Sequence, residues 1–237
     1  MANQPAMEQL AKYKQTMGEE LGEAFHFCRQ HLFDLTITWD QSETLFGNEL
    51  RTAVLNRTGG RLAYNIRRHF HGIVVLGIMR LMDPPKTRNK KNLVLKLLPL
   101  LCDDSCRNLA TPVLQRLDGY SKVLIDARNK ILAHNDYDYL TSEGANLSQG
   151  SRSQITQIFQ TILEFLNIIE FHYSKSRTMI PPMGNHDAIL HLHYLDQGLR
   201  LKTKIESDVK EGRDSWKEFR EIPAWLRIEK NEGERYR

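Results

Sequence analysis

Apolar residues recur every three or four positions along most of this sequence, and this periodicity constrains the fold more than any other feature. The first stripe runs from residue 10 to residue 39 and has the spacing of one face of a long helix. No region alternates apolar and polar residues as a half-buried strand would. The sequence therefore predicts an all-α bundle. The members of the first stripe are Leu10, Tyr13, Met17, Leu21, Ala24, Cys28, Leu32, Leu35 and Trp39.

Glycine and proline divide the later periodic segments into further helices. Gly59 and Gly60 predict a break or a new start. Pro84 and Pro85 predict the end of a helix that is apolar almost all round at its centre, because proline has no amide hydrogen and restricts the residue before it. Asn92 is a candidate N-cap for the next helix. Helices are expected over about 43–56, 61–82, 93–101, 105–133, 151–173 and 188–205.

Length and composition fit a globular chain with a sizeable core. The chain has 237 residues, of which 41% are hydrophobic and 26% are charged, values that are ordinary for a soluble domain. Pro181 and Pro182 interrupt the helical pattern, and the sequence beyond Lys210 is dense in charge. We therefore predict a helical bundle over residues 1–180 and a C-terminal helical extension over residues 181–237.

The three cysteines and the apolar runs bear on the cellular compartment. Cys28, Cys102 and Cys106 are too few and too widely spaced for a disulfide framework, which favours a reducing compartment. The start of the chain lacks the pattern of a signal peptide. The most apolar run, residues 72–79, is far shorter than the roughly 20 residues that a membrane span needs. The sequence predicts a cytoplasmic protein with no membrane partner.

Basic residues cluster between Arg61 and Lys96, where Asp83 is the only acidic residue. Such a local excess favours contact with phosphate groups more than the formal net charge of +4 does. The alternative is a solvated helix face followed by a basic loop. The basic residues of this run are Arg61, Arg67, Arg68, Arg80, Lys86, Arg88, Lys90, Lys91 and Lys96.

The stretch "RNKILAHND", residues 128–136, places an arginine and a histidine at the end of the helix expected over 105–133. At about 100° per residue, Arg128 and His134 lie roughly 60° to either side of Ile131. They are about 9 Å apart along the axis, so one helix does not bring their head groups together. The alternative is structural: Arg128 pairs with a carboxylate and His134 caps the helix. Ile131 ends the apolar stripe Val113, Leu117, Tyr120, Leu124, Ala127 and Ile131.

Two motifs resemble one known family. "RNKILAH" resembles the R-x(4–6)-H signature of the HEPN superfamily, with Asn129 at the polar position that often follows the arginine. "RLMDPPKTRNKKNLVLKLL", residues 80–98, is similar to the segment that precedes this signature in the AbiU-type abortive-infection branch. There a helix ends in Leu-x-Asp-Pro and is followed by a basic loop, Asn-Leu and a short helix. The order and the all-α setting agree from about residue 10 to about residue 175.

The resemblance implies a HEPN-like bundle that dimerises and cuts RNA without a metal, as a toxin or in phage defence. It implies RNA and a second copy of the chain as partners, allows an antitoxin or another regulatory protein as a further partner, and implies no cofactor. The catalytic residues would be Arg128, His134, Asn129 and Asp136. The residues expected to bind RNA are Arg80, Lys86, Arg88, Lys90, Lys91 and Lys130.

The chemistry suits these residue types. A histidine can move protons near neutral pH, and an arginine can bind phosphate oxygens with two parallel hydrogen bonds. One histidine cannot easily stand on both sides of a phosphorus atom, whereas a two-fold dimer supplies a second His134 and a second Arg128. Asn129 could orient the phosphate or hold the histidine ring, and Asp136 could polarise that ring.

Two departures from the family pattern keep another function open. Five residues separate Arg128 from His134, where four is commonest, and the tyrosine that is modified in some relatives would fall at Asp136. A non-catalytic module for dimerisation, or for binding nucleic acid or a partner, is the alternative. His191 and His193 lie two apart and point to different faces of a helix, so no metal site is predicted there.

Overall fold

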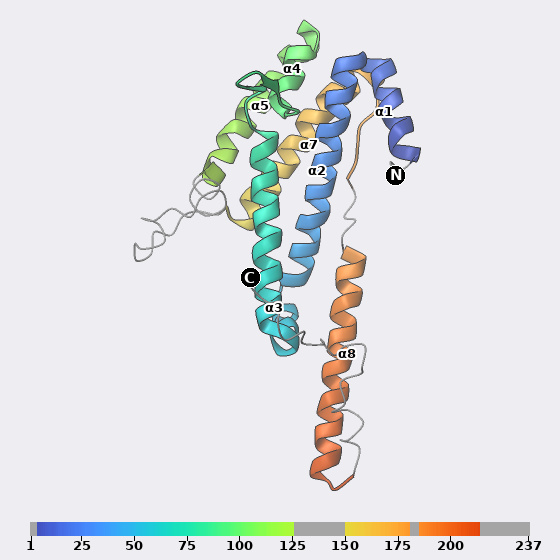
Figure 1. The fold of residues 1–237 in the computed structure, drawn as a ribbon, viewed down its shortest axis with the longest axis vertical. Coiled ribbons are helices and arrows are strands. Elements are labelled where there is room, and N and C mark those ends of the chain that lie inside the picture. The colour runs from blue at the N-terminus through green and yellow to red at the C-terminus, as the bar shows by residue number, and fades with distance from the viewer. Residues whose placement is uncertain (1–3, 126–149, 181–184, 214–237) are drawn as a thin grey trace, which may run out of the picture.

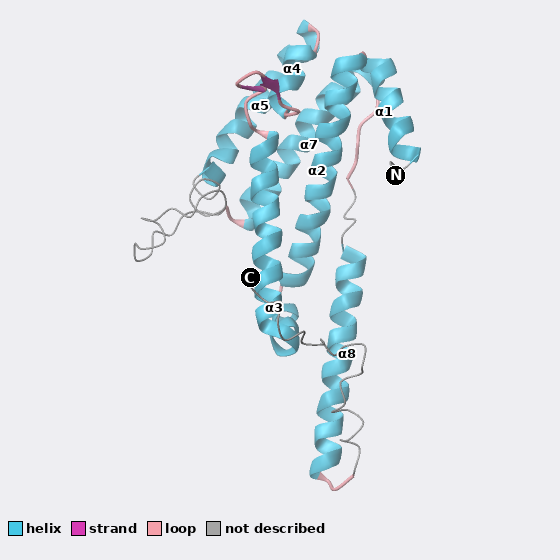
Figure 2. Cartoon of the chain, viewed as in Figure 1, coloured by secondary structure: helices cyan, strands magenta, loops and turns pink. Residues whose placement is uncertain are grey.

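The structure is a computed structural model that describes residues 4–125, 150–180 and 185–213. These residues form seven α-helices, two short 3₁₀ turns and one small hairpin, which holds the only strands drawn in Figure 2. The all-α prediction is confirmed. The elements are α1 Gln4–Met17, α2 Glu19–Phe46, α3 Glu49–Leu81, β1 Lys86–Thr87, β2 Lys90–Lys91, η1 Leu95–Leu97, α4 Leu98–Leu101, α5 Asp104–Ser121, η2 Lys122–Leu124, α7 Arg152–Ser174 and α8 Asn185–Lys210.

The helices form a bundle with one extended member. Helices α2, α3 and α7 stand side by side, α5 lies against α7, and α1 folds back on α2 (Figure 1). Helix α8 begins beside α2 and α3 and runs on past the turn that joins them (Figure 1). None of the helices in the described residues is both long enough and apolar enough to cross a bilayer.

The first apolar stripe is buried, but it lies on two helices. We expected one helix over residues 10–39, and this expectation is wrong because Gly18, at φ +87°, separates α1 from α2. Residues that carry a side chain rarely adopt this backbone conformation, whereas glycine adopts it without strain. Gly22 then allows close packing, since a Cβ there would lie 2.5 Å from the Tyr13 backbone.

The boundary between α2 and α3 also differs from the expected one. Helix α2 continues to Phe46, and α3 starts after Asn48, whose side chain accepts hydrogen bonds from the backbone amides of Leu50, at 2.8 Å, and Arg51. The interruption predicted at the glycine pair is confirmed, because Gly59 has non-helical backbone angles inside α3. This bend turns the first part of α3 away from the axis of the rest.

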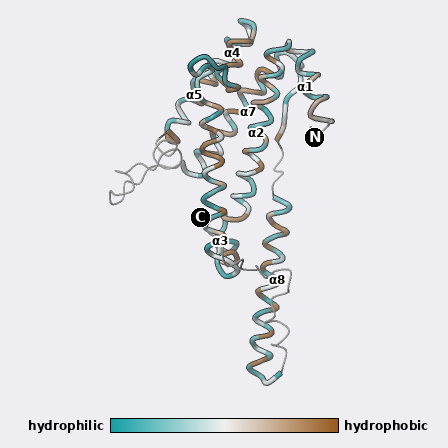
Figure 3. Tube along the Cα trace, in the orientation of Figure 1, coloured by the Kyte–Doolittle hydropathy of each residue, from teal (hydrophilic) through white to brown (hydrophobic). Residues whose placement is uncertain are grey.

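The main core lies between α1, α2, α5, α7 and the C-terminal half of α3. Ile78, Leu117 and Phe165 are fully buried in it. Helices α2 and α3 approach closely at Gly77, where a Cβ would lie 2.3 Å from Leu35 Cδ2. Figure 3 shows the hydrophobic residues of α3 gathered in this half, whereas its other half is more hydrophilic.

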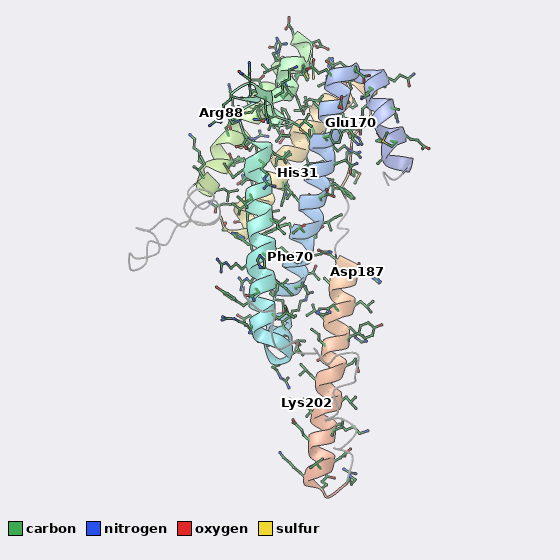
Figure 4. All side chains as sticks on the ribbon, in the orientation of Figure 1. His31, Phe70, Arg88, Glu170, Asp187 and Lys202 are labelled. Carbon is green, nitrogen blue, oxygen red and sulfur yellow. The ribbon has the colours of Figure 1, made fainter. Side chains whose placement is uncertain are left out.

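A second, smaller cluster joins α8 to the bundle. Leu45 and Phe46 at the end of α2, Leu55 and Ala63 of α3 and Ala188 of α8 are buried in it. Figure 4 shows Phe70 on the lower part of α3, and this side chain packs against the same cluster. The proposed division of the chain near residue 180 stays a prediction.

A buried carboxylate fixes α1 and the segment after α7. Glu170 is 5% exposed and accepts hydrogen bonds from Tyr13 Oη at 2.8 Å and from Thr178 Oγ1 at 2.6 Å. Burial is the main reason that the pKa of Tyr13 rises to about 12, so the phenol stays protonated and keeps donating. Arg29 donates to Thr178 Oγ1 at 2.9 Å and completes the network.

Candidate functional site

The four predicted catalytic residues, and Lys130 of the predicted RNA-binding set, fall outside the described residues. Arg128, Asn129, Lys130, His134 and Asp136 all belong to residues 126–149, for which the structure gives no description. Their arrangement therefore stays a prediction. The described residues show the frame from which this segment starts and to which it returns, together with the basic surface predicted to bind RNA.

The two ends of the segment 126–149 are held close together. Leu124, at the end of η2, is fully buried, and Gly150 precedes α7 with φ +79°. A Cβ on Gly150 would lie 2.8 Å from Leu124 Cδ2. A larger residue at 150 would thus be strained and crowded, and glycine is the residue that allows the chain to return beside its point of departure.

The start of α7 is fixed by a cap and by one arginine. Ser151 and Gln154 form a reciprocal capping box, in which each side chain accepts a hydrogen bond from the backbone amide of the other residue. Arg152 donates to the carbonyl oxygens of Phe46 at 2.8 Å and Gly47 at 3.1 Å. Its Nε also lies 3.1 Å from Glu43 Oε1. This arginine ties the beginning of α7 to the turn between α2 and α3.

The apolar stripe that leads to Arg128 faces the interior of its own chain. Val113, Leu117 and Leu124 belong to the main core, in which α5 packs along α7. An ion pair between Arg116 and Glu164 links the same two helices at the surface. The described part of this stripe is therefore covered by α7 of the same chain.

The basic loop is a short antiparallel hairpin at the end of α3. Lys86 pairs with Lys91, and Thr87 pairs with Lys90. Arg88 occupies the tip with φ +55°. The expectation that Asn92 caps the next helix is wrong, because its side-chain amide donates to Pro84 O at 2.8 Å and Thr87 Oγ1 at 2.7 Å. Asn92 therefore holds the base of the hairpin, and Val94 precedes the next helical turn.

The charges of the hairpin point into solvent. Lys86, Arg88, Lys90 and Lys91 are all exposed, and Figure 4 shows Arg88 on the hairpin beyond the end of α3. Lys91 pairs with Glu20 of α2. The other three have no ion-pair partner among the described residues. The structure thus places these four predicted residues on one turn, and Arg80 is exposed on the last turn of α3.

The exposed basic surface extends along α3 beyond the residues predicted to bind RNA. No carboxylate occurs between Glu49, the first residue of α3, and Asp83, which follows the helix. Three of the exposed arginines belong to the basic run in which the sequence favours phosphate contact, and Arg57 lies just before that run. These exposed arginines are Arg57, Arg61, Arg67 and Arg68.

A cavity of about 560 Å³ lies beside the start of α7. Arg67, Asn56 and Glu49 line it, together with Asn48 and Arg152, whose side chains are already engaged with backbone groups. The described residues contain no group of three or more histidine, cysteine, aspartate or glutamate side chains placed to hold a metal ion. In particular, His186, Asp187, His191 and His193 of α8 form no such group.

Comparison with known proteins identifies the family. A family model described as AbiU2, of the HEPN type, matches residues 18–192, which is most of the chain. The matched range includes the basic hairpin and the motif from Arg128 to His134. No curated protein and no solved structure gave a match. The resemblance of the two sequence motifs is confirmed, and the chain belongs to the AbiU2 family of HEPN proteins.

Proposed function

We propose that this protein is a metal-independent endoribonuclease that acts as a toxin or phage-defence effector. The observation that carries the proposal is the pair Arg128 and His134 at family-compatible spacing, inside the range that matches the HEPN family model. The exposed basic hairpin supports it, because RNA binding rests largely on contacts between cationic side chains and phosphates. Cytoplasmic location and control by an antitoxin belong to the same proposal.

The proposed reaction is an internal transfer at phosphorus. The 2′-hydroxyl loses its proton, its oxygen attacks the adjacent phosphorus, and the bond to the 5′-oxygen breaks. One His134 takes the first proton and another protonates the leaving oxygen, while Arg128 binds the phosphate oxygens. The products are a 2′,3′-cyclic phosphate and a 5′-hydroxyl. Asn129 would orient the phosphate, and Asp136 would orient the histidine ring.

We further propose that two chains contribute to one site. In-line cleavage needs proton transfer on opposite sides of the phosphorus atom, which a two-fold dimer provides with two copies of His134. The partners would then be RNA and a second copy of this chain. Lys86, Arg88 and Lys90 of the hairpin, with Arg80 and Lys130, would bind the phosphates beside the cut.

The central experiment incubates the purified protein with mixed RNA in the presence of EDTA. Products ending in 2′,3′-cyclic phosphate are expected. His134→Ala and Arg128→Ala should each lower the cleavage rate by at least about a hundredfold, the usual size of an acid–base or charge-stabilising contribution. His186→Ala changes an exposed histidine of α8 and is the matched control. Cleavage that requires a divalent metal, or folded variants that cut at the parental rate, would refute the assignment.

A mixing experiment tests the shared site. Parent chains are allowed to exchange with an excess of His134→Ala chains, and cleavage is measured afterwards. Most parent chains then sit in heterodimers, so activity should fall well below the amount of parent chain present. Activity proportional to that amount, or a fully active monomer, contradicts a site made by two chains.

Neutralising the hairpin tests its part in substrate binding. Replacing Lys86, Arg88 and Lys90 with glutamine removes three charges that have no ion-pair partner among the described residues. RNA binding should weaken, and its dependence on salt should flatten because fewer counterions are released. An unchanged salt dependence would remove the hairpin from the binding surface.

The second candidate function is a non-catalytic HEPN module that dimerises or binds nucleic acid or a protein. The observation that favours it is the spacing of five residues between Arg128 and His134 instead of the commoner four. The EDTA assay separates the two candidates. A folded dimer that binds RNA but leaves it intact supports the module.

A further inference from the structure

Arg51 of α3 donates to Thr44 O at 3.0 Å, but the other five arginines of this helix differ from those of the other helices in having no partner among the described residues. Arg57, Arg61, Arg67, Arg68 and Arg80 are exposed, and none makes a side-chain hydrogen bond or an ion pair with the described residues. Arginines on the other helices are engaged by carboxylates, hydroxyls or carbonyl oxygens. These engaged residues are Arg29 on α2, Arg107 and Arg116 on α5, Arg152 on α7 and Arg200 on α8.

Three of the side chains on α3 share one outward face. Ala63, Ile66 and Phe70 point to the second apolar cluster, so Arg61 and Arg68 lie on the opposite side of the helix. Seven residues apart, they fall within about 20° of the same direction and about 10 Å from each other along the axis. Tyr64 lies between them along the helix and is 60% exposed.

The Tyr64 ring is accessible to a ligand, because most of the side chain is exposed. No ring contact or hydrogen bond of its side chain occurs among the described residues. An exposed aromatic ring between two cations combines the two elements that bind single-stranded nucleic acid, a stacking surface for a base and charges for the phosphates on either side. The bases of a duplex are already stacked on one another and are not available to such a ring.

We propose that Arg61, Tyr64 and Arg68, the arginine face of α3, bind single-stranded RNA outside the catalytic segment. Phosphates contact the two guanidinium groups, and one base stacks on the Tyr64 ring. Arg68 lies 12 residues before Arg80, about 18 Å along the helix axis at 1.5 Å per residue, and the hairpin follows the C-terminal end of α3 (Figure 1). The strand held by the arginine face is thus a different part of the RNA from the part at the hairpin. This inference rests on the proposed function for the identity of its ligand.

The test measures binding of a fluorescent single-stranded oligoribonucleotide to the full chain carrying His134→Ala, which keeps the RNA intact. In this background, Arg61→Gln with Arg68→Gln should weaken binding by roughly tenfold or more. The slope of log affinity against log salt should become shallower by about 1.4, because each of the two lost phosphate contacts on a single strand contributes about 0.7. Circular dichroism checks the fold, which these exposed positions should leave unchanged.

A matched control removes two charges elsewhere. Arg200→Gln with Lys202→Gln neutralises two exposed residues of α8 that pair with Asp196 and Glu206. It lowers the net charge by the same amount and should change binding by less than about twofold, leaving the slope intact. Equal losses in the two double variants would show a general charge effect and would overturn the proposal.

The tyrosine separates stacking from charge. Tyr64→Phe keeps the aromatic ring and should bind RNA as the parent does, whereas Tyr64→Ala should lose roughly tenfold in affinity, because base stacking on an aromatic ring contributes about that much or more. A Tyr64→Ala variant with parental affinity, or a duplex of the same sequence bound as tightly as the single strand, would refute the single-stranded ligand.

Failure of this inference differs from failure of the proposed function. If the parent chain binds single strands through the arginine face but never cuts them, the nuclease proposal fails and the binding surface stands. If the parent chain cuts RNA and the Arg61→Gln, Arg68→Gln variant binds like the matched control, the nuclease stands and the arginine face is wrong.

Discussion

After the bend at Gly59, the two halves of the rest of α3 have different surroundings. In the C-terminal half, residues 72–81, Val74, Val75 and Ile78 are fully buried in the main core. In the preceding half, residues 60–71, Ala63 is the only buried residue, and most others are exposed. The neighbours of a helix, more than its own periodicity, therefore decide whether it serves as core or as surface. Four predictions test this comparison.

The largest expected effect on stability comes from replacing an isoleucine with alanine in each of the two halves. Ile78→Ala removes a fully buried side chain and should lower the free energy of unfolding by about 2–5 kcal/mol, because it leaves a cavity in a packed core. Ile66→Ala, in the half-buried second cluster, should cost clearly less. Urea unfolding followed by circular dichroism measures both. Equal losses would mean that the second cluster is packed as tightly as the main core.

The second prediction concerns two glycines of α3. Gly77→Ala places a Cβ where it would lie 2.3 Å from Leu35 Cδ2, so the buried Leu35 side chain or the two helices must shift, and a loss of about 1–3 kcal/mol is expected. Gly60→Ala meets only Asn56 Oδ1, at 3.7 Å, and should be neutral or stabilising by up to about 1 kcal/mol. Thermal unfolding compares the two. A neutral Gly77→Ala would show that the close approach of α2 and α3 is dispensable.

The third prediction compares the caps of two helices. Asp103 begins α5 at the main core, and Asn48 begins α3 beside the second cluster. The hydrogen bond from the Cys106 amide is the chief cause of a pKa of Asp103 well below its usual range, and His172 also contributes to it. A lowered carboxyl pKa adds stability above the ordinary value near 3.9, and this stability is lost as the pH falls from there toward the folded value.

Unfolding measured at a series of pH values tests this difference. The stability gap between the parent and Asp103→Asn should be constant near neutral pH and should shrink in acid. The gap between the parent and Asn48→Ala, about 1 kcal/mol, should not depend on this titration. A gap for Asp103→Asn that stays constant below pH 4 would contradict the charged cap.

The smallest effect lies within the buried half of α3. Ile73 is 52% exposed, although Gly72 and Val74, the residues before and after it, are buried. Ile73→Ala should therefore change the free energy of unfolding by only about 0.5 kcal/mol, as is usual for surface positions. The same unfolding assay applies. A loss near that of Ile78→Ala would indicate that something covers Ile73 in solution, and a second copy of the chain would then be the first candidate.

The class of fold and most of the helices follow from the local sequence. The spacing of apolar residues predicted the buried positions from Tyr13 to Trp39, the start of α7 at Ser151 and the interruption at Gly59. These features are local, because they depend on periodicity, on capping side chains and on the backbone freedom of glycine. The two motifs also predicted the family, which the comparison confirmed.

The points at which helices break, and the residues that each helix face contacts, depend on the tertiary structure. Gly18 could have continued a helix, and only its backbone angles show that α1 folds back onto α2. Asn92 has the residue type of a cap, yet its nearest partners are Pro84 and Thr87 across the hairpin. An apolar stripe such as that on α5 can face either a second chain or the core of its own chain, and its packing along α7 places it in the core of its own chain. Each of these outcomes depends on contacts between residues distant along the chain or on a choice between two allowed backbone conformations, and neither is encoded in local periodicity.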